Sequence, residues 1–495
     1  MILHEERDYL ITYNNLLSEL SKEFNQSFAS IASPTLSKQE TVSYLYNNIQ
    51  EYLIKKNKLK FPLKRIIQFI PRLLYLFFKL IYISFKYRIK NIPANTVFFR
   101  SWLVPRSLNE GFYYDDYFRS LPLDLLQYEK TLIGINSTDL KLLKKCNFLN
   151  NSLVNSNGLL SFKDVFKVFI TYLKNGLLKA NNVYLYKDID ITFLINRTLL
   201  IEYLCLNPFE AYLEFEKCKK LINFNIKAYC YIYENQSWEK AACYAYKNTN
   251  VKTIAYQSSG FSPIFLNFYP TLYDSHNHPM PNIILTVGDY FTKYLKENGN
   301  YLIPIKTFGA LRFEYKNDGL KYLVSKPNTL ILNRILYAFS VHINFYNEII
   351  EDLMEIFQNT TINVDLKLHP IYYDSFKFNI NLPSNFKIIN QVNNDELCNY
   401  YDFILFNDSS FGIESILCGV KSFQYNRIGK FLDNRFFYFN LWNPNVDFND
   451  LIILRDQLLS KNLNKYYNQE EASKYINNMY KPYIGNVDIF RQTLI

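Results

Sequence analysis

Two segments in the 364–425 region carry residue types suited to binding a phosphorylated ligand. The first segment, VDLKLHP, alternates apolar and polar residues as a strand with one buried face does, and it ends at His369 and Pro370. The second, DFILFNDSSFGIESILCG, is typical of a buried strand, a turn and a helix that begins near Ser409 and Ser410. A helix N-terminus reached from the carboxyl end of a parallel strand is an anion site. The spacing therefore predicts that this half of the chain binds a nucleotide.

Glu414 lies about one helical turn beyond the serine pair, where its carboxylate could accept hydrogen bonds from sugar hydroxyls. Each motif also has a simpler interpretation. A His-Pro pair can merely end a strand, because proline lacks a donor. A Ser-Ser pair can merely cap a helix. The ligand interpretation is favoured because the two motifs lie about 40 residues apart, each after a predicted buried strand, as neighbouring strand ends of one doubly wound sheet would.

These motifs resemble the carboxyl-terminal domain of bacterial GT-B glycosyltransferases that build surface polysaccharides. The residues that carry the resemblance are His369-Pro370 and Ser410-x3-Glu414-x4-Gly419. Within that group the pattern is similar to the sialyl-, polysialyl- and Kdo-transferases, which use CMP-activated sugars. A related pattern occurs in the CDP-glycerol glycerophosphotransferases. The resemblance implies a nucleotide-sugar donor bound by these residues and a glycan or lipid-linked glycan acceptor.

A looser resemblance covers the amino half. The segment 233–239, YENQSWE, and the segment 254–259 resemble motifs of a surface-carbohydrate biosynthesis group, and the likeness extends over about residues 96–430. Gln257 and Ser258 follow a predicted strand, so we expect them to contact the acceptor.

An inverting transfer needs a base for the acceptor hydroxyl and donors for the departing phosphate. The sialyltransferase-type families carry the base in an acidic-acidic-Gly motif, which here is Asn109-Glu110-Gly111, with one acid. Glu234 is the alternative base because it follows a predicted strand, although it could instead cap the next helix. His369, the serine pair and Arg312 are the candidate phosphate ligands. The sequence does not distinguish an inverting from a retaining outcome.

Neither a metal nor a cofactor is predicted. No DxD motif follows a predicted buried strand, and Asp115-Asp116 lies in an aromatic loop. The seven cysteines form no CxxC pair, so we expect reduced, buried thiols. The amino terminus carries early acidic residues and lacks the apolar core of a secretory signal.

The predicted fold class is α/β, with the GT-B architecture of two Rossmann-like doubly wound domains that face a cleft, and an N-terminal helical extension. At 495 residues the chain is long enough for two cores. Helices in residues 1–60 are expected to have polar faces and to pack on the outside. The expected parts are a helical region at 1–94, an acceptor domain at 95–315, a nucleotide-sugar-binding domain at 325–469 and a returning helix within 470–495. The expected strands are 95–104, 181–186, 228–233, 253–256, 282–287, 303–308, 328–333, 364–368, 403–406 and one from Val420.

The positive charge is local. From Lys55 to Arg100 there are twelve Lys or Arg and no Asp or Glu, which leaves a net charge of −2 on the rest of the chain. Within a predicted amphipathic segment, 61–90, four basic residues recur every seven positions: Arg65, Arg72, Lys79 and Lys86. Lys79 interrupts the apolar run, so this segment is expected to lie in a membrane interface rather than to span it.

The alternative for this segment is a domain helix with a solvated basic stripe. Nucleic acid is not an expected partner, because bulky aliphatic residues separate the basic ones and no nucleic-acid module is visible. The expected location is cytoplasmic, on the inner face of the membrane. Two other functions stay open: transfer of a polyol phosphate from a CDP-linked donor, and a non-catalytic nucleotide-sugar-binding scaffold.

Overall fold

The computed structural model divides the chain into two compact units. Unit 1 comprises Met1–Ser258, Ile264–Arg312 and Tyr483–Ile495, and unit 2 comprises Ser259–Pro263 and Phe313–Pro482. The structure describes residues 2–24, 27–39, 44–55, 62–109, 111–148, 152–258, 260–261, 265–313, 332–340, 346–369, 372, 380–390, 392, 397–407, 409–425, 445–461, 474, 477–483, 485 and 487–495.

Unit 1 is built on a seven-stranded parallel sheet with the strand order β11-β10-β9-β8-β1-β4-β5. The chain order reverses between β1 and β8, because β4 and β5 lie on one side of β1 and the later strands lie on the other. This is the Rossmann order with one added strand. The strands are β1 (Thr96–Trp102), β4 (Lys130–Asn136), β5 (Leu153–Asn155), β8 (Ala228–Ile232), β9 (Lys252–Tyr256), β10 (Ile283–Thr286) and β11 (Ile305–Thr307).

Unit 2 repeats this plan with a six-stranded parallel sheet in the order β14-β13-β12-β15-β16-β17. Here the chain order reverses between β12 and β15. The strands are β12 (Arg334–Ala338), β13 (Asn363–Lys367), β14 (Phe386–Ile389), β15 (Phe403–Phe406), β16 (Lys421–Tyr425) and β17 (Asn445–Val446). The predicted α/β class with two doubly wound sheets is thus confirmed.

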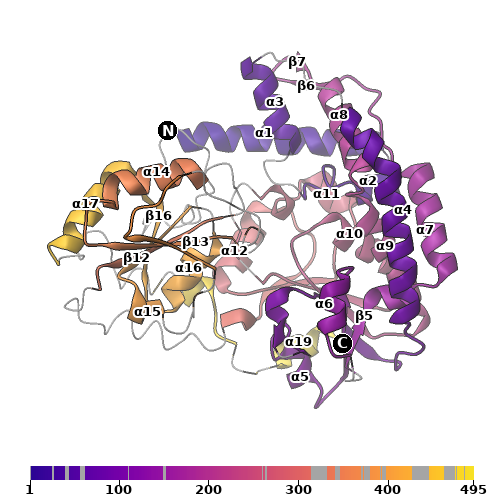
Figure 1. Cartoon of the computed structure of the whole chain (residues 1–495). Coiled ribbons are helices and arrows are strands. Elements are labelled where there is room, and N and C mark those ends of the chain that lie inside the picture. The colour runs from indigo at the N-terminus through magenta and orange to yellow at the C-terminus, as the bar shows by residue number, and fades with distance from the viewer. Residues whose placement is uncertain are drawn as a thin grey trace. The chain divides into compact units, whose positions relative to one another are not determined.

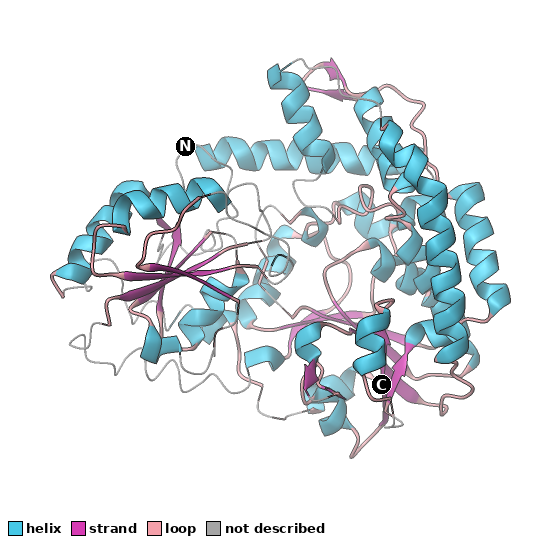
Figure 2. Ribbon diagram, in the orientation of Figure 1, coloured by secondary structure: helices cyan, strands magenta, loops and turns pink. Residues whose placement is uncertain are grey.

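Helices cover both faces of each sheet (Figure 1, Figure 2). Those of unit 1 are α1 (Ile2–Glu23), α2 (Phe28–Ala32), α3 (Tyr44–Lys55), α4 (Leu63–Lys86), α5 (Leu121–Leu125), α6 (Leu140–Lys145), α7 (Phe162–Asn175), α8 (Thr192–Leu204), α9 (Phe209–Asn223), α10 (Ser237–Tyr246), α11 (Leu272–Asn277), α12 (Asp289–Asn298) and α19 (Asp488–Thr493). Those of unit 2 are α14 (Tyr346–Phe357), α15 (Leu397–Tyr400), α16 (Ser410–Leu417) and α17 (Phe448–Leu459).

One strand prediction was wrong. Residues 181–186 contribute only Leu185–Tyr186 (β6), which pairs with Ile189–Asp190 (β7) in a small hairpin outside the main sheet. The two strands that lie beyond β1 in the seven-stranded sheet are β4 and β5, which were not predicted. Of the strand expected at 328–333, residues 328–331 lie outside the described residues, and the first described strand of unit 2 begins at Arg334. Most of the segment within 470–495 that was expected to begin the returning helix also lies outside the described residues.

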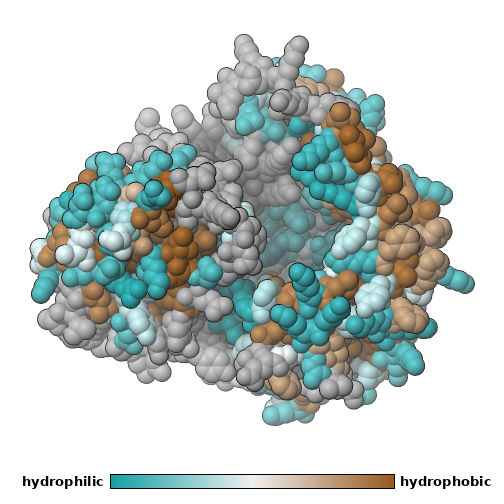
Figure 3. All heavy atoms as spheres, in the orientation of Figure 1, coloured by the Kyte–Doolittle hydropathy of each residue, from teal (hydrophilic) through white to brown (hydrophobic). Residues whose placement is uncertain are grey.

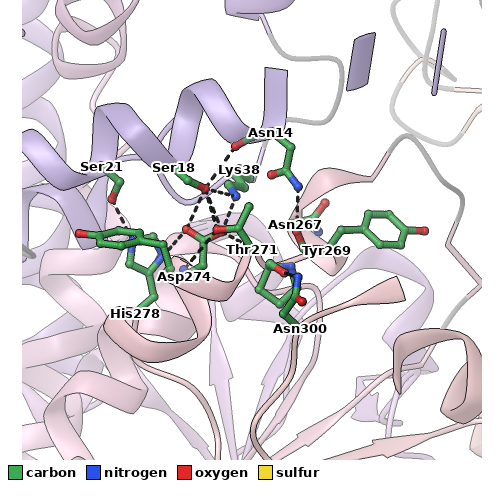
Figure 4. A network of polar contacts seen from close by, with 12 residues as sticks. Asn14, Ser18, Ser21, Lys38, Asn267, Tyr269, Thr271, Asp274, His278 and Asn300 are labelled. Atoms are coloured by element: carbon green, nitrogen blue, oxygen red, sulfur yellow. Dashed lines mark hydrogen bonds and ion pairs between the residues drawn. The ribbon is translucent and has the colours of Figure 1, made fainter. Parts of the chain in front are cut away.

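Residues 1–60 were expected to pack on the outside, but residues 29–38 within this segment are all buried in unit 1. A polar network fixes this segment (Figure 4): Lys38 forms a buried ion pair with Asp274, and the Ser18 hydroxyl donates to the same carboxylate at 3.2 Å. Burial disfavours ionisation of Asp274, but the charge and hydrogen bond of Lys38, together with the electrostatic effects of His278 and Lys240, outweigh it and lower the pKa of the carboxyl. Burial also lowers the pKa of the neighbouring His278 to about 3, so the ring is neutral at physiological pH.

The described cysteines form no disulfide, and five of the six are buried. Burial raises the pKa of the Cys146 thiol to about 11 and that of the Cys243 thiol to about 12. These two thiols are therefore poor nucleophiles.

Candidate functional site

The carboxyl ends of β1 and β8 meet where the strand order of unit 1 reverses. Ligands of open α/β sheets bind in the crevice outside the carboxyl ends at such a point. Strand β8 ends at Ile232 and delivers Tyr233 and Glu234 beyond the sheet, while β1 ends at Trp102. Glu234 was predicted to follow a strand end. The structure places it after β8, at the topological switch point of unit 1.

Side chains of the following turn hold the Glu234 carboxylate. Trp238 Nε1–H donates to Gln236 Oε1 at 2.7 Å, and Gln236 Nε2–H donates to Glu234 Oε2. The backbone carbonyl of Glu234 accepts from Asn267 Nδ2–H. Among the described residues, Glu234 Oε1 has no hydrogen-bond partner, and the side chain is half-buried. One carboxylate oxygen is thus fixed and the other is available.

Glu239, not Glu234, is the capping carboxylate of α10. Its side chain accepts from the backbone N–H of Glu234 at 3.1 Å and from that of Asn235 at 2.9 Å. Asn235 has a left-handed φ of 52°, which turns the chain sharply between strand and helix. Glu239 is buried, and burial followed by the nearby Glu234 charge raises its pKa well above the usual range. The capping interpretation of Glu234 is therefore not what the structure shows.

Arg100 is a completely buried cation on β1, the strand that pairs with β8. Its guanidinium carbon lies 4.2 Å from the ring centre of Trp102 and 3.6 Å from that of Trp238. Arg100 Nη2–H donates to Glu210 Oε1 at 2.9 Å. Burial raises the pKa of Glu234, and the Arg100 charge lowers it in part. Because burial has the larger effect, the pKa of Glu234 stays above that of an ordinary glutamate, and its carboxylate is the stronger base.

Two hydrogen bonds made by Tyr256 of β9 position the turn that carries Arg312. The hydroxyl of Tyr256, the last residue of β9, donates to Gly309 O at 2.9 Å and accepts from Leu311 N at 2.9 Å. These two bonds fix the turn that carries Arg312, which is half-buried. Arg312 therefore belongs to unit 1 together with Glu234.

Tyr117 also lies in this group, with its ring centre 5.1 Å from that of Trp102. Burial raises the pKa of its hydroxyl, the charges of Arg106 and Arg312 lower it, and the charges of Asp116 and Glu234 raise it. The Tyr117 hydroxyl thus senses the charges of both Arg312 and Glu234.

The predicted acceptor residues lie at the end of β9. Gln257 is completely buried, and its Oε1 accepts from Val287 N at 3.2 Å, so it joins the ends of β9 and β10. Ser258 is 3% exposed. Their contact with an acceptor stays a prediction. Glu110, the other candidate base, lies outside the described residues.

In unit 2 the strand order reverses between β12 and β15, and small polar groups occupy this point. Asn407, directly after β15, donates through Nδ2 to Ser340 Oγ, two residues after β12, at 3.4 Å. Gln424 Nε2–H donates to Asn407 O at 2.5 Å. Asn407 is buried, and its Oδ1 has no partner among the described residues. The Asn407 side chain thus links the segments that follow β15 and β12, the two strands between which the chain order reverses.

Helix α16 begins at this same point. The Ser409 side chain caps it by accepting from Phe411 N at 3.3 Å. Gly412 permits the close approach of α16 to β15, because a Cβ there would lie 2.0 Å from the ring of Phe406. Glu414 is buried in the first turns of the helix. The N-terminus of α16 therefore lies at the carboxyl edge of the sheet, directly after β15.

His369 lies two residues after the neighbouring strand β13 and is half-buried. Its ring centre is 6.4 Å from that of Tyr372, which is 6.0 Å from that of Tyr346 at the start of α14. The structure therefore brings His369, Ser409 and Glu414 to one unit, as the sequence predicted, and their donor-binding role stays a prediction. Pro370 and the Ser410 side chain lie outside the described residues.

Sequence reasoning missed three residues of these two edges: Arg100, Trp102 and Ser340. Arg100 and Trp102 stand in the predicted strand 95–104, and an arginine within an otherwise apolar strand, TVFFRSW, is the signal that could have identified them. Ser340 follows β12, which lies beyond the segment 328–333 where a strand was expected. Among the described residues, no group of three or more His, Cys, Asp or Glu side chains could hold a metal ion.

Comparisons with known proteins show similar folds and no family. No family matches the sequence, and no curated protein matches it. The UDP-GlcNAc 2-epimerase of Neisseria meningitidis, bound to UDP-GlcNAc, aligns with a TM-score of 0.40 at 12% identity, over 77% of this chain and 98% of the other.

Two further solved structures give similar values. The α,α-trehalose 6-phosphate synthase of Burkholderia multivorans aligns with a TM-score of 0.45 at 7% identity, over 81% of this chain and 96% of the other. The glycosyltransferase SnogD of Streptomyces nogalater aligns with a TM-score of 0.43 at 12% identity, over 81% and 100%. These scores assign no activity, so function has to be inferred from the residues at the two sheet edges.

Proposed function

We propose that the protein is a glycosyltransferase in which unit 2 binds a nucleotide-activated sugar and unit 1 supplies the general base. One observation carries this proposal: the Glu234 carboxylate stands at the switch point of a Rossmann-order sheet, with one oxygen fixed by Gln236 and the other available. A fixed carboxylate of raised pKa is suited to proton abstraction near neutral pH.

The proposed step is a direct displacement. Glu234 Oε1 takes the proton of an acceptor hydroxyl as that oxygen attacks the anomeric carbon of the donor sugar. The bond between the anomeric carbon and the phosphate oxygen breaks, and the nucleotide leaves with the bonding electrons. Donors already in place stabilise the charge on the leaving phosphate. In unit 2 the candidate donors are His369 and the N-terminus of α16.

The donor we propose is a CMP-linked nonulosonic acid or Kdo, and the acceptor is a glycan of a capsule, O-antigen or lipooligosaccharide. This choice is supported by the resemblance of the His-Pro and Ser-rich motifs to transferases that use CMP-activated sugars. The small polar groups at the unit 2 switch point, Ser340 and Asn407, suit a nucleotide phosphate and sugar rather than an apolar ligand.

A ligand panel tests the donor. We expect CMP-linked sugars to raise the melting temperature of the whole protein, because a ligand that binds only the folded state stabilises it by mass action. CDP-linked, UDP-linked and GDP-linked compounds serve as comparisons. Stabilisation by CDP-glycerol alone, with release of CMP, would point to polyol-phosphate transfer. Donor binding without turnover on any acceptor would make the protein a scaffold.

A further inference from the structure

Helices α4 and α7 of unit 1 expose large apolar side chains to solvent. Figure 3 shows hydrophobic atoms gathered over these two helices at the right of the view. On α4, Phe85 is 81% exposed and Phe78 is 64% exposed, while on α7 Phe162 is 58% exposed. We name this surface the α4–α7 face and define it by six residues: Ile67, Ile70, Phe78, Phe85, Phe162 and Phe166.

The two helices form one surface because their aromatic rings meet. Phe77 of α4 lies 6.3 Å from Phe162 and 6.5 Å from Phe166, measured between ring centres. Phe162 and Phe166 stack on each other at 6.4 Å. Large contiguous apolar patches mark interaction sites on soluble proteins.

The opposite side of α4 is built into the core of unit 1. Phe69, Leu73 and Leu80 are buried in a cluster with residues of α7, α8 and α9. By length and composition α4 is also the one helix among the described residues that could cross a membrane. Crossing would withdraw these buried side chains from their cluster and leave the rest of that cluster exposed. The packing therefore favours a helix that lies along a surface.

A basic stripe runs beside the apolar face. At about 100° per residue, positions seven apart drift slowly around a helix, so Arg65, Arg72, Lys79 and Lys86 form one line between the exposed apolar sector and the buried sector. Lys79 Nζ lies 5.3 Å from the ring centre of Tyr75. The segment from Lys55 to Arg100 holds no acidic residue that could neutralise the stripe.

We propose that the α4–α7 face docks on a bilayer surface that contains anionic phospholipids, with α4 lying in the plane of the interface. The phenylalanines enter the acyl boundary, and the basic side chains reach the phosphates of the head groups. Charge complementarity favours this occupant, because a second copy of the chain would set two uncompensated basic stripes against each other. This inference does not depend on the proposed transfer reaction.

The test is flotation of the full chain with vesicles of phosphatidylglycerol and phosphatidylcholine, and with vesicles of phosphatidylcholine alone. We expect binding to the anionic vesicles that weakens with salt but does not vanish, because screening acts on the charges and not on the apolar insertion. Arg65→Glu/Arg72→Glu/Lys79→Glu/Lys86→Glu should lower partitioning at least several hundredfold, since each basic residue near an anionic surface contributes about a fivefold factor. Phe78→Ser/Phe85→Ser should remove the salt-resistant fraction.

A matched variant reverses four exposed lysines elsewhere in unit 1: Lys130→Glu, Lys144→Glu, Lys296→Glu and Lys306→Glu. It should bind as the unaltered chain does, and circular dichroism should show all variants folded. The proposal fails if the unaltered chain does not bind anionic vesicles at low salt, or if the matched variant loses as much binding as the stripe variant. Resistance to alkaline extraction would show a spanning helix instead. A dimer that Phe78→Ser/Phe85→Ser dissociates, without vesicle binding, would show that a second copy covers the face.

Discussion

The two units share a strand order, yet different kinds of groups occupy their switch points. In unit 1, polar and aromatic side chains hold a single carboxylate: Trp238 orients Gln236, Gln236 holds Glu234, and Arg100 packs on the Trp238 ring. In unit 2, a buried amide and a serine span the point, and a helix N-terminus faces it. The first arrangement suits proton transfer and the second suits an anion. The topology decides where a ligand can bind, and a few side chains decide what chemistry follows.

The largest expected effect comes from the carboxylate of unit 1. Glu234→Gln keeps the shape and the Gln236 contact but removes the base, so turnover at saturating donor should fall by about 10²-fold or more. Donor affinity should be retained. Glu297→Gln, on the exposed surface of α12, is the control and should keep full turnover. If Glu110→Gln slows the reaction and Glu234→Gln does not, the base belongs to the other motif.

The next effect concerns the anion site of unit 2. His369→Ala should lower turnover by about 10²-fold, the usual cost of losing one donor to a developing oxyanion. The melting temperature should hardly change, because His369 is half-buried at a strand end. A drop of many degrees with donor affinity intact would instead make His369 a packing residue.

Glu414→Gln should weaken donor binding by about 1–3 kcal/mol, the cost of losing a charged hydrogen-bond partner. Isothermal titration calorimetry with the best donor of the panel measures this change. Equal affinities of the two proteins would remove Glu414 from the site. A lower melting temperature with unchanged affinity would assign the buried carboxylate to the folding of α16.

The smallest effect separates positioning from catalysis in unit 1. Trp238→Phe keeps a ring beside Arg100 but removes the Nε1–H that orients Gln236. Without that orientation the Gln236 donor favours ionised Glu234 less, so the pKa of Glu234 should rise. Since the base must be deprotonated, the acidic limb of the kcat/KM profile should move to higher pH, with a loss of about tenfold or less at neutral pH. A uniform loss at every pH would indicate a packing defect.

The sequence alone determined the fold class and most strands that carry the site. Strand β15, Phe403–Phe406, was predicted at its observed bounds, because a short apolar run between polar turns has few other solutions in a parallel sheet. The positions of His369, Ser409 and Glu414 were predicted for the same reason, because strand ends and helix starts are local signals. Strand β4 was missed because Gly134 interrupts its apolar run, and β5 was missed because three residues are too few to show a period.

Only the tertiary structure decided which residues surround Glu234. Arg100 and Glu234 are far apart in the sequence, and they come together because β1 and β8 pair in register, with Arg100 opposite Tyr231. Long-range pairing also decides the place of the N-terminal segment. Its polar residues suggested an exposed layer, but Lys38 pairs with Asp274 inside unit 1. Local pattern fixes the elements, whereas long-range pairing determines which buried charges find a partner, and that pairing has no periodic signal in the sequence.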